Sequence, residues 1–170
     1  MAKKQYHRPG KEPKHKLCPK FEDAVVFYLE NTEDQKIALE FAAWLRKNRM
    51  SPLTGTGGYN WYINVKGHHV CSIKMYNDTW YIIPWSEHRS SNGRGILNDV
   101  LAVEKIKEVV WDNISECMGC NYGCKPNFID INIHGREIKG VCRSFFLRFR
   151  NPDSQTVEIL KEILLTNKNM

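Results

Sequence analysis

Hydrophobic residues recur at helical spacing in two segments near the start of the chain. The first segment, residues 21–29, is short and mostly apolar. The second begins with the sequence TEDQ at residues 32–35, a capping-box pattern in which Thr32 caps the helix and Gln35 reaches back. One apolar stripe follows it, formed by Ile37, Phe41, Trp44 and Leu45. The pattern predicts two helices, the second ending before Ser51-Pro52.

Three segments with strand-like alternation come next. Residues 59–66 alternate with a period of two, residues 70–76 return after a turn at Gly67, and residues 79–85 follow the two-residue turn Asn77-Asp78. Links this short join antiparallel neighbours. The segment therefore predicts a three-stranded antiparallel meander.

The second half of the chain repeats both kinds of pattern. Helical stripes are formed by Val103, Ile106 and Val110, and later by Val157, Leu160 and Leu164. Asn151-Pro152 predicts the N-cap and first position of the last helix. Residues 129–133 and 145–149 alternate as strands do. The order predicts an α+β fold, in which the three-stranded meander and the C-terminal strands form one antiparallel sheet with about four helices packed on one side.

Charge is concentrated at one end of the chain. Residues 1–20 hold seven Lys or Arg and one Glu, which equals the net charge of +6 of the whole chain. This pattern predicts a basic flexible tail over residues 1–19 and a single α+β domain over residues 20–170. A weak contact of residues 1–20 with nucleic acid is the alternative reading of the tail.

The cysteines and the lack of a secretory signal indicate the compartment. The basic start has no apolar stretch behind it, and the apolar run Ala24 to Leu29 is too short to span a bilayer. Six cysteines without such a signal favour a reducing environment, where thiols stay free or bind metal. We therefore expect a cytoplasmic protein without membrane contact.

Four cysteines have the spacing of a metal site. The sequence is Cys117-x2-Cys120-x3-Cys124, and we expect a 17-residue hairpin to return Cys142 to the same place. Zinc prefers four tetrahedral ligands, and a C-x2-C turn brings two thiolates to one ion. The spacing predicts a structural Zn²⁺ in a knuckle over residues 117–142. Such a site is closed, which disfavours zinc catalysis.

Three other readings of these cysteines stay open. A redox pair requires its C-x2-C at a helix N-terminus, whereas this pair follows a helix. An iron–sulfur cluster or another thiophilic metal also takes four cysteines, although the spacing departs from the ferredoxin patterns. Plain buried thiols explain an isolated cysteine such as Cys71 better than three cysteines within eight residues.

Aromatic residues crowd the predicted meander. Together with neighbouring amides they suit either a ligand pocket or the core of the domain. Alternation puts Trp61 and Tyr62 on opposite faces of their strand. The candidate pocket walls are Trp61, Tyr62, Trp80 and Trp85. His68-His69 is read as a pair of exposed turn residues, and no catalytic triad is predicted.

Several runs of the chain resemble a family of small, uncharacterised bacterial proteins. They are WYINVKGHHVCSIKMYNDTWYI, CMGCNYGC, INIHGREIKGVC and FRNPDS, and the likeness covers about residues 20–165. This resemblance implies no activity. The order of helices and strands is also similar to that of gyrase-inhibitor-like small-molecule-binding domains, a likeness of fold alone.

The sequence therefore predicts a zinc-stabilised, non-enzymatic domain that binds a small-molecule ligand or a partner. One alternative is a nucleic-acid-associated protein that uses its basic tail. Another is an enzyme with a site in the aromatic meander, with Glu87 or His88 as candidate groups. The sequence specifies neither the ligand nor the oligomeric state.

Overall fold

The computed structural model describes residues 20–55, 59–84, 104–114, 128–133, 136–142 and 147–168. Within these ranges the helices are α1 (Phe21–Tyr28), α2 (Thr32–Lys47), α4 (Glu104–Asp112) and α5 (Ser154–Lys168). The strands are β1 (Pro52–Thr54), β2 (Asn60–Val65), β3 (His68–Met75), β4 (Trp80–Pro84), β5 (Phe128–Ile133), β6 (Arg136–Cys142) and β7 (Phe149–Arg150). The predicted α+β class with an antiparallel sheet is confirmed.

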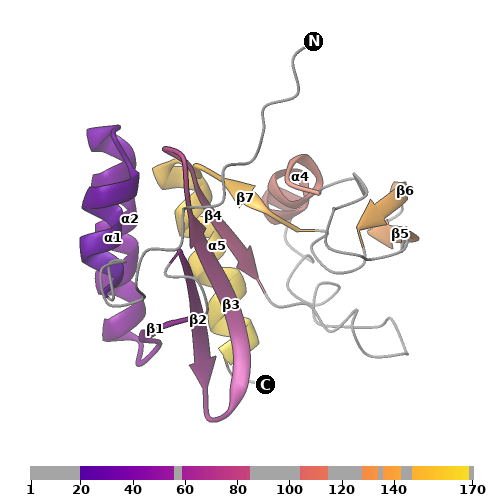
Figure 1. Ribbon diagram of the computed structural model, residues 1–170. Helices are drawn as coiled ribbons and strands as arrows, with labels where there is room; N and C mark the ends of the chain where they lie inside the picture. The colour runs from indigo at the N-terminus through magenta and orange to yellow at the C-terminus, as the bar shows by residue number, and fades with distance from the viewer. Residues whose placement is uncertain are drawn as a thin grey trace.

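The main sheet has five strands in the order β1-β2-β3-β4-β7, and each described pair in it is antiparallel. Helices α1, α2 and α5 pack on one face of this sheet (Figure 1). A separate hairpin, β5–β6, lies on the far side of α4 from the main sheet (Figure 1). The meander predicted from sequence is thus the centre of a wider sheet. The predicted strand at residues 129–133 is not part of that sheet, because it pairs with β6 in the separate hairpin.

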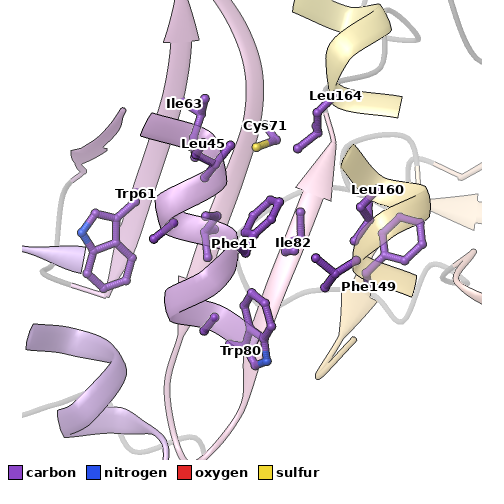
Figure 2. Packing of buried hydrophobic residues seen from close by; sticks show 14 of the residues in the cluster. Phe41, Leu45, Trp61, Ile63, Cys71, Trp80, Ile82, Phe149, Leu160 and Leu164 are labelled. Atoms are coloured by element: carbon purple, nitrogen blue, oxygen red, sulfur yellow. The ribbon is translucent and has the colours of Figure 1, made fainter. Parts of the chain in front are cut away.

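A hydrophobic core fills the space between the helices and the sheet. Figure 2 shows Phe41 of α2 next to Ile82 of β4, and Leu164 of α5 pointing toward Cys71 of β3. All four residues are fully buried. The apolar stripes predicted for α2 and for the last helix are confirmed, because Ile37, Leu45, Val157 and Leu164 are buried in the same cluster.

Two helix starts differ from the sequence prediction. Asn31, not Thr32, caps α2: its Oδ1 accepts from the backbone N–H of Glu33 at 2.9 Å and of Asp34 at 3.4 Å. Gln35 reaches back as predicted, but to the carbonyl of Leu29. Asp153, not Asn151, caps α5, since its Oδ1 accepts from Thr156 N–H at 2.7 Å. In both cases the side chain of the residue just before the helix reaches the free amides.

Asn151 has a different function in the sheet. Its φ of 40° lies in the left-handed region, which asparagine tolerates. Its side-chain Oδ1 accepts from Trp80 N–H at 2.8 Å, and its own N–H donates to Trp80 O at 2.9 Å. Asn151 therefore ends β7 by clamping it to the start of β4.

The two predicted hairpin turns are confirmed. Lys66 and Gly67 both have positive φ, as do Asn77 and Asp78, which is the signature of a tight turn that matches strand twist. Asp78 also accepts from Glu30 N–H at 2.7 Å through Oδ1. The β3–β4 turn is therefore fastened to the link between α1 and α2.

The first strand of the sheet was not predicted. Residues 52–54 form β1 at the edge of the sheet, between the predicted second helix and the predicted strand 59–66. Gly55 N–H continues the pairing by donating to Asn60 O at 2.7 Å.

Among the described residues no helix is long and apolar enough to span a bilayer. The predicted tail, Glu87, His88 and Phe145 lie outside the described ranges.

Candidate functional site

Trp61 and Trp80 of the meander belong to the core. Trp61 and Trp80 are each 0% exposed, and Trp61 meets Phe21 edge-on with ring centroids 5.4 Å apart. In Figure 2 both indoles lie on the helix-covered side of the sheet. A ligand from solvent reaches neither indole without opening the core. Trp85, the fourth candidate wall, lies outside the described residues.

Tyr62 faces the opposite way and is 37% exposed. It shares the outer face of the main sheet, the face away from α2 and α5, with a set of mostly polar side chains. Gly55 lies so close to its ring that a Cβ there would come within 2.5 Å of Cε2. The register of the strands gives the outer face as Leu53, Asn60, Tyr62, Asn64, His69, Ser72, Lys74, Tyr81, Ile83 and Arg150.

No acidic residue occurs in the five strands of the main sheet as described. Their basic residues include Lys74 in β3 and Arg150 in β7, and Arg148 precedes β7. Lys74 lies opposite Tyr81, and Tyr81 lies opposite Arg150. One cross-strand row of the outer face is therefore cationic.

Lys74, Tyr81 and Arg148 form the centre of this row. The Arg148 guanidinium carbon lies 5.7 Å from the centroid of the Tyr81 ring, a cation–π distance. Burial, and next the charge of Arg148, lowers the pKa of Lys74 below its usual value. The two cations are therefore close enough to repel each other. We call these three residues the cationic cluster.

The cationic cluster is bordered by tyrosines and by an amide. Tyr76 stacks on Tyr81 with centroids 5.4 Å apart, and Tyr59 meets Tyr76 edge-on at 6.5 Å. Asn60 lies opposite Lys74 and is 7% exposed. Its Oδ1 has no hydrogen-bond partner among the described residues. A buried acceptor without a donor is costly, so this site favours a ligand that brings one.

His69 does not protrude from the hairpin as the sequence suggested. A β-bulge between Ile63 and Asn64 makes Val70 an extra residue, and Val70 and Cys71 are both fully buried. The bulge shifts the alternation by one position and brings His69 to the outer face beside Tyr62, with ring centroids 5.7 Å apart. Its neighbour His68 is exposed, as predicted.

Both ring nitrogens of His69 have hydrogen-bond partners. Nδ1 lies 2.9 Å from Asn64 Oδ1, and Nε2 lies 3.0 Å from Ser72 Oγ. The three side chains form one continuous hydrogen-bonded chain across β2 and β3. Asn64 is exposed, His69 is half-buried and Ser72 keeps 9% of its surface.

The predicted metal ligands lie mostly outside the described part of the chain. Cys117, Cys120 and Cys124 fall between α4 and β5, and only the backbone of Cys142 is described, at the end of β6. Cys142 pairs with Phe128, so β5 and β6 form the hairpin excursion that the sequence predicted. No group of three or more metal-ligating side chains occurs within the described ranges.

Cys71 is the buried thiol that the sequence suggested. It is fully buried in the core, and burial raises the pKa of its thiol. Deprotonation of Cys71 is therefore strongly disfavoured. Because a metal ligand must be a thiolate, its surroundings are those of a core residue.

Sequence reasoning missed the outer-face groups for two reasons. The bulge that re-aims His69 has no glycine or other local signal in the segment HHVCS. Lys74, Tyr81 and Arg148 come together only because β7 pairs with β4, a contact between segments far apart in the chain. The absence of acidic residues from the strands was visible in the sequence.

Comparison of the chain with protein-family models, curated proteins and solved structures finds no match.

Proposed function

We propose that the chain is a zinc-stabilised ligand-binding domain that takes a small anion at the cationic cluster on its outer sheet face. The observation that carries this proposal is the juxtaposition of Lys74 and Arg148 in a sheet whose strands hold no acidic residue. Nearby positive charges favour an anion, and charge-assisted hydrogen bonds are the stronger kind.

The free protein has an electrostatic cost at this site that an anion would offset. The charged form of Lys74 is disfavoured by burial and by Arg148. An anion between them supplies the opposite charge to both cations. Tyr81 holds the Arg148 side chain through its ring, so the guanidinium is oriented before the ligand arrives.

The amide of Asn60 narrows the class of ligand. Its buried Oδ1 has no donor among the described residues and lies in the row of the cationic cluster. A ligand that carries a hydroxyl or amine beside its anionic group supplies that donor. The best candidates are hydroxy acids, amino acids and small phosphorylated alcohols.

Titration calorimetry tests the binding site with glycerol 3-phosphate and citrate as probes. We expect binding to the wild type and a loss of at least about tenfold in affinity for Lys74→Met, since a charged hydrogen bond disappears. Lys36→Met is the matched control, because Lys36 is exposed on α2, which packs on the other face of the sheet. Glycerol, which lacks the anion, should not bind. Equal affinities for the two variants, or no heat with either anion, would contradict the proposal.

The zinc site is supported by spacing and by the hairpin. Pairing of Phe128 with Cys142 returns the last cysteine close to the start of β5. Cys124 precedes Phe128 by four residues, a length of chain that spans at most roughly 14 Å. Cys117, Cys120, Cys124 and Cys142 are the proposed ligands, and a closed set of four thiolates suits a structural ion.

Metal analysis tests this part of the proposal. Native mass spectrometry of freshly purified protein should give one zinc per chain, and Cys120→Ser should lose it. Structural zinc contributes an apparent ~10–16 kcal/mol of binding free energy in small peptides, much of it coupled to folding. Cys71→Ser is the control and should keep the metal, because Cys71 lies in the core. A wild-type protein without bound metal would overturn the site.

Single-stranded nucleic acid is a second candidate ligand. Tyr62 and Arg150 are exposed on the outer face, and aromatic rings beside cations form stacking surfaces for bases. The basic residues 1–20 would add phosphate contacts. An oligonucleotide that binds with an affinity falling steeply with salt would favour this candidate, whereas a weak, salt-independent signal would exclude it.

A further inference from the structure

The hydrogen-bonded side chains of Asn64, His69 and Ser72 have the arrangement that activates a serine hydroxyl. Asn64 Oδ1 accepts hydrogen bonds only, so the hydrogen between it and His69 resides on Nδ1. In this tautomer of the neutral imidazole Nε2 is the acceptor, and it accepts from the Ser72 hydroxyl at 3.0 Å. A nucleophile in contact with a base, and a third group that orients the base, is the geometry of nucleophilic catalysis.

The surroundings of these three side chains also favour nucleophilic catalysis. The edge-on contact with Tyr62 fixes the plane of the His69 ring. Ser72 is only 9% exposed, which restricts access to small groups.

We propose that Ser72 is a nucleophile for acyl transfer, with His69 as general base and Asn64 as the residue that positions it. Ser72 Oγ attacks the carbonyl carbon of a small ester, and its proton passes to His69 Nε2. The bond from the carbonyl carbon to the leaving oxygen breaks, and His69 returns the proton to that oxygen. Water then attacks the acyl-serine through the same base, which releases the acid and restores Ser72.

This activity goes beyond ligand binding and rests on a different observation. Ser72, His69 and Asn64 are not members of the cationic cluster. Failure of the calorimetric test therefore leaves the acyl-transfer proposal standing, and the reverse also holds.

Covalent labelling with diisopropyl fluorophosphate tests the proposal. The Ser72 Oγ–P bond forms, the P–F bond breaks, fluoride leaves and the serine proton is taken by His69. Peptide mass spectrometry should find the adduct on Ser72 of the folded wild type. Ser51, an exposed serine, is the internal reference for background reaction. Labelling of Ser72 no faster than Ser51 would overturn the proposal.

Variants of the histidine pair separate catalysis from general reactivity. His69→Ala should slow labelling about a hundredfold or more, because a general base is lost. His68→Ala is the matched control and should react at the wild-type rate, since His68 is exposed at the hairpin end. A His69→Ala protein labelled at the wild-type rate contradicts the proposal. Circular dichroism confirms folding, and His69→Gln replaces His69→Ala if the latter unfolds.

Asn64 acts through His69, and its test includes rescue. Asn64→Ala should slow labelling of Ser72, whereas Asn64→Asp should restore it, because a carboxylate oxygen also accepts from Nδ1. A purely structural asparagine would show no such recovery. Equal labelling of the alanine and aspartate variants would therefore contradict the positioning role.

Discussion

At the level of single residues, neighbouring aromatic side chains in the meander lie in opposite environments. Trp61 and Tyr62 are adjacent in sequence, yet Trp61 is fully buried and Tyr62 is 37% exposed. Strand alternation predicted this difference from the sequence. Trp61 is the residue that faces the helices, because Phe21 of α1 packs against it. Phe41 of α2 packs against Trp80 on the same side of the sheet.

Substitution of the aromatic residues should separate core from surface. Trp80→Ala should lower the free energy of unfolding by about 3–5 kcal/mol, because it opens a large cavity under Phe41. Tyr62→Ala is the control and should cost about 1 kcal/mol or less, since its ring is partly solvated. Urea denaturation measures both values. Similar losses for the two variants would show that Tyr62 also belongs to the core.

Lys74 should destabilise the free protein near neutral pH. Its pKa is lowered by burial and by Arg148, so between the folded and unfolded pKa values the unfolded chain binds more protons. The cost of the charge is fully present below the folded pKa and disappears as pH rises toward the unfolded value of about 10.4. Lys74→Met should therefore raise the melting temperature at pH 7, with a gain that shrinks by pH 10. A gain that is constant with pH would contradict this account.

At the level of helices and strands, apolar spacing and turn residues predicted the structure better than the candidate capping residues did. The stripe of α2 and the turn at Asn77-Asp78 were predicted correctly, because spacing and turn residues act within a few positions. The caps were assigned one or two residues away, since Asn31 and Thr32 are both good capping residues and stand side by side. The bulge at Val70 had no local signal, and with it the position of His69 was lost.

Paired substitutions test the cap of α2. Asn31→Ala should cost about 1 kcal/mol, because two backbone amides lose their acceptor. Thr32→Ala should change the stability by less than about 0.5 kcal/mol, since Thr32 is exposed at the first helical position. Thermal unfolding of both variants measures the difference. A larger loss for Thr32→Ala would restore the capping box that the sequence suggested.

At the scale of the whole molecule, charge is distributed unevenly over a domain that is neutral from residue 21 onward. The strands of the main sheet carry no acidic residue, whereas α1 and α2 carry five acidic residues (Glu22, Asp23, Glu33, Asp34 and Glu40) and three basic ones (Lys36, Arg46 and Lys47). Composition alone placed the positive charge in residues 1–20. Composition did not reveal the cationic outer face, because acidic residues on the helices offset the positive charge of that face in the net charge. Such separation directs an anion to the sheet.

The position of the bound anion tests the central claim most directly. Backbone amide shifts of ¹⁵N-labelled full-length protein, recorded by NMR during titration with glycerol 3-phosphate or citrate, locate the site. We predict that the largest shifts occur at Ser72–Lys74, Tyr81 and Arg148–Arg150, while α1 and α2 on the opposite face stay unchanged. Shifts confined to the helices, to residues 117–142 or to residues 1–20 would contradict an anion site on the outer face of the sheet.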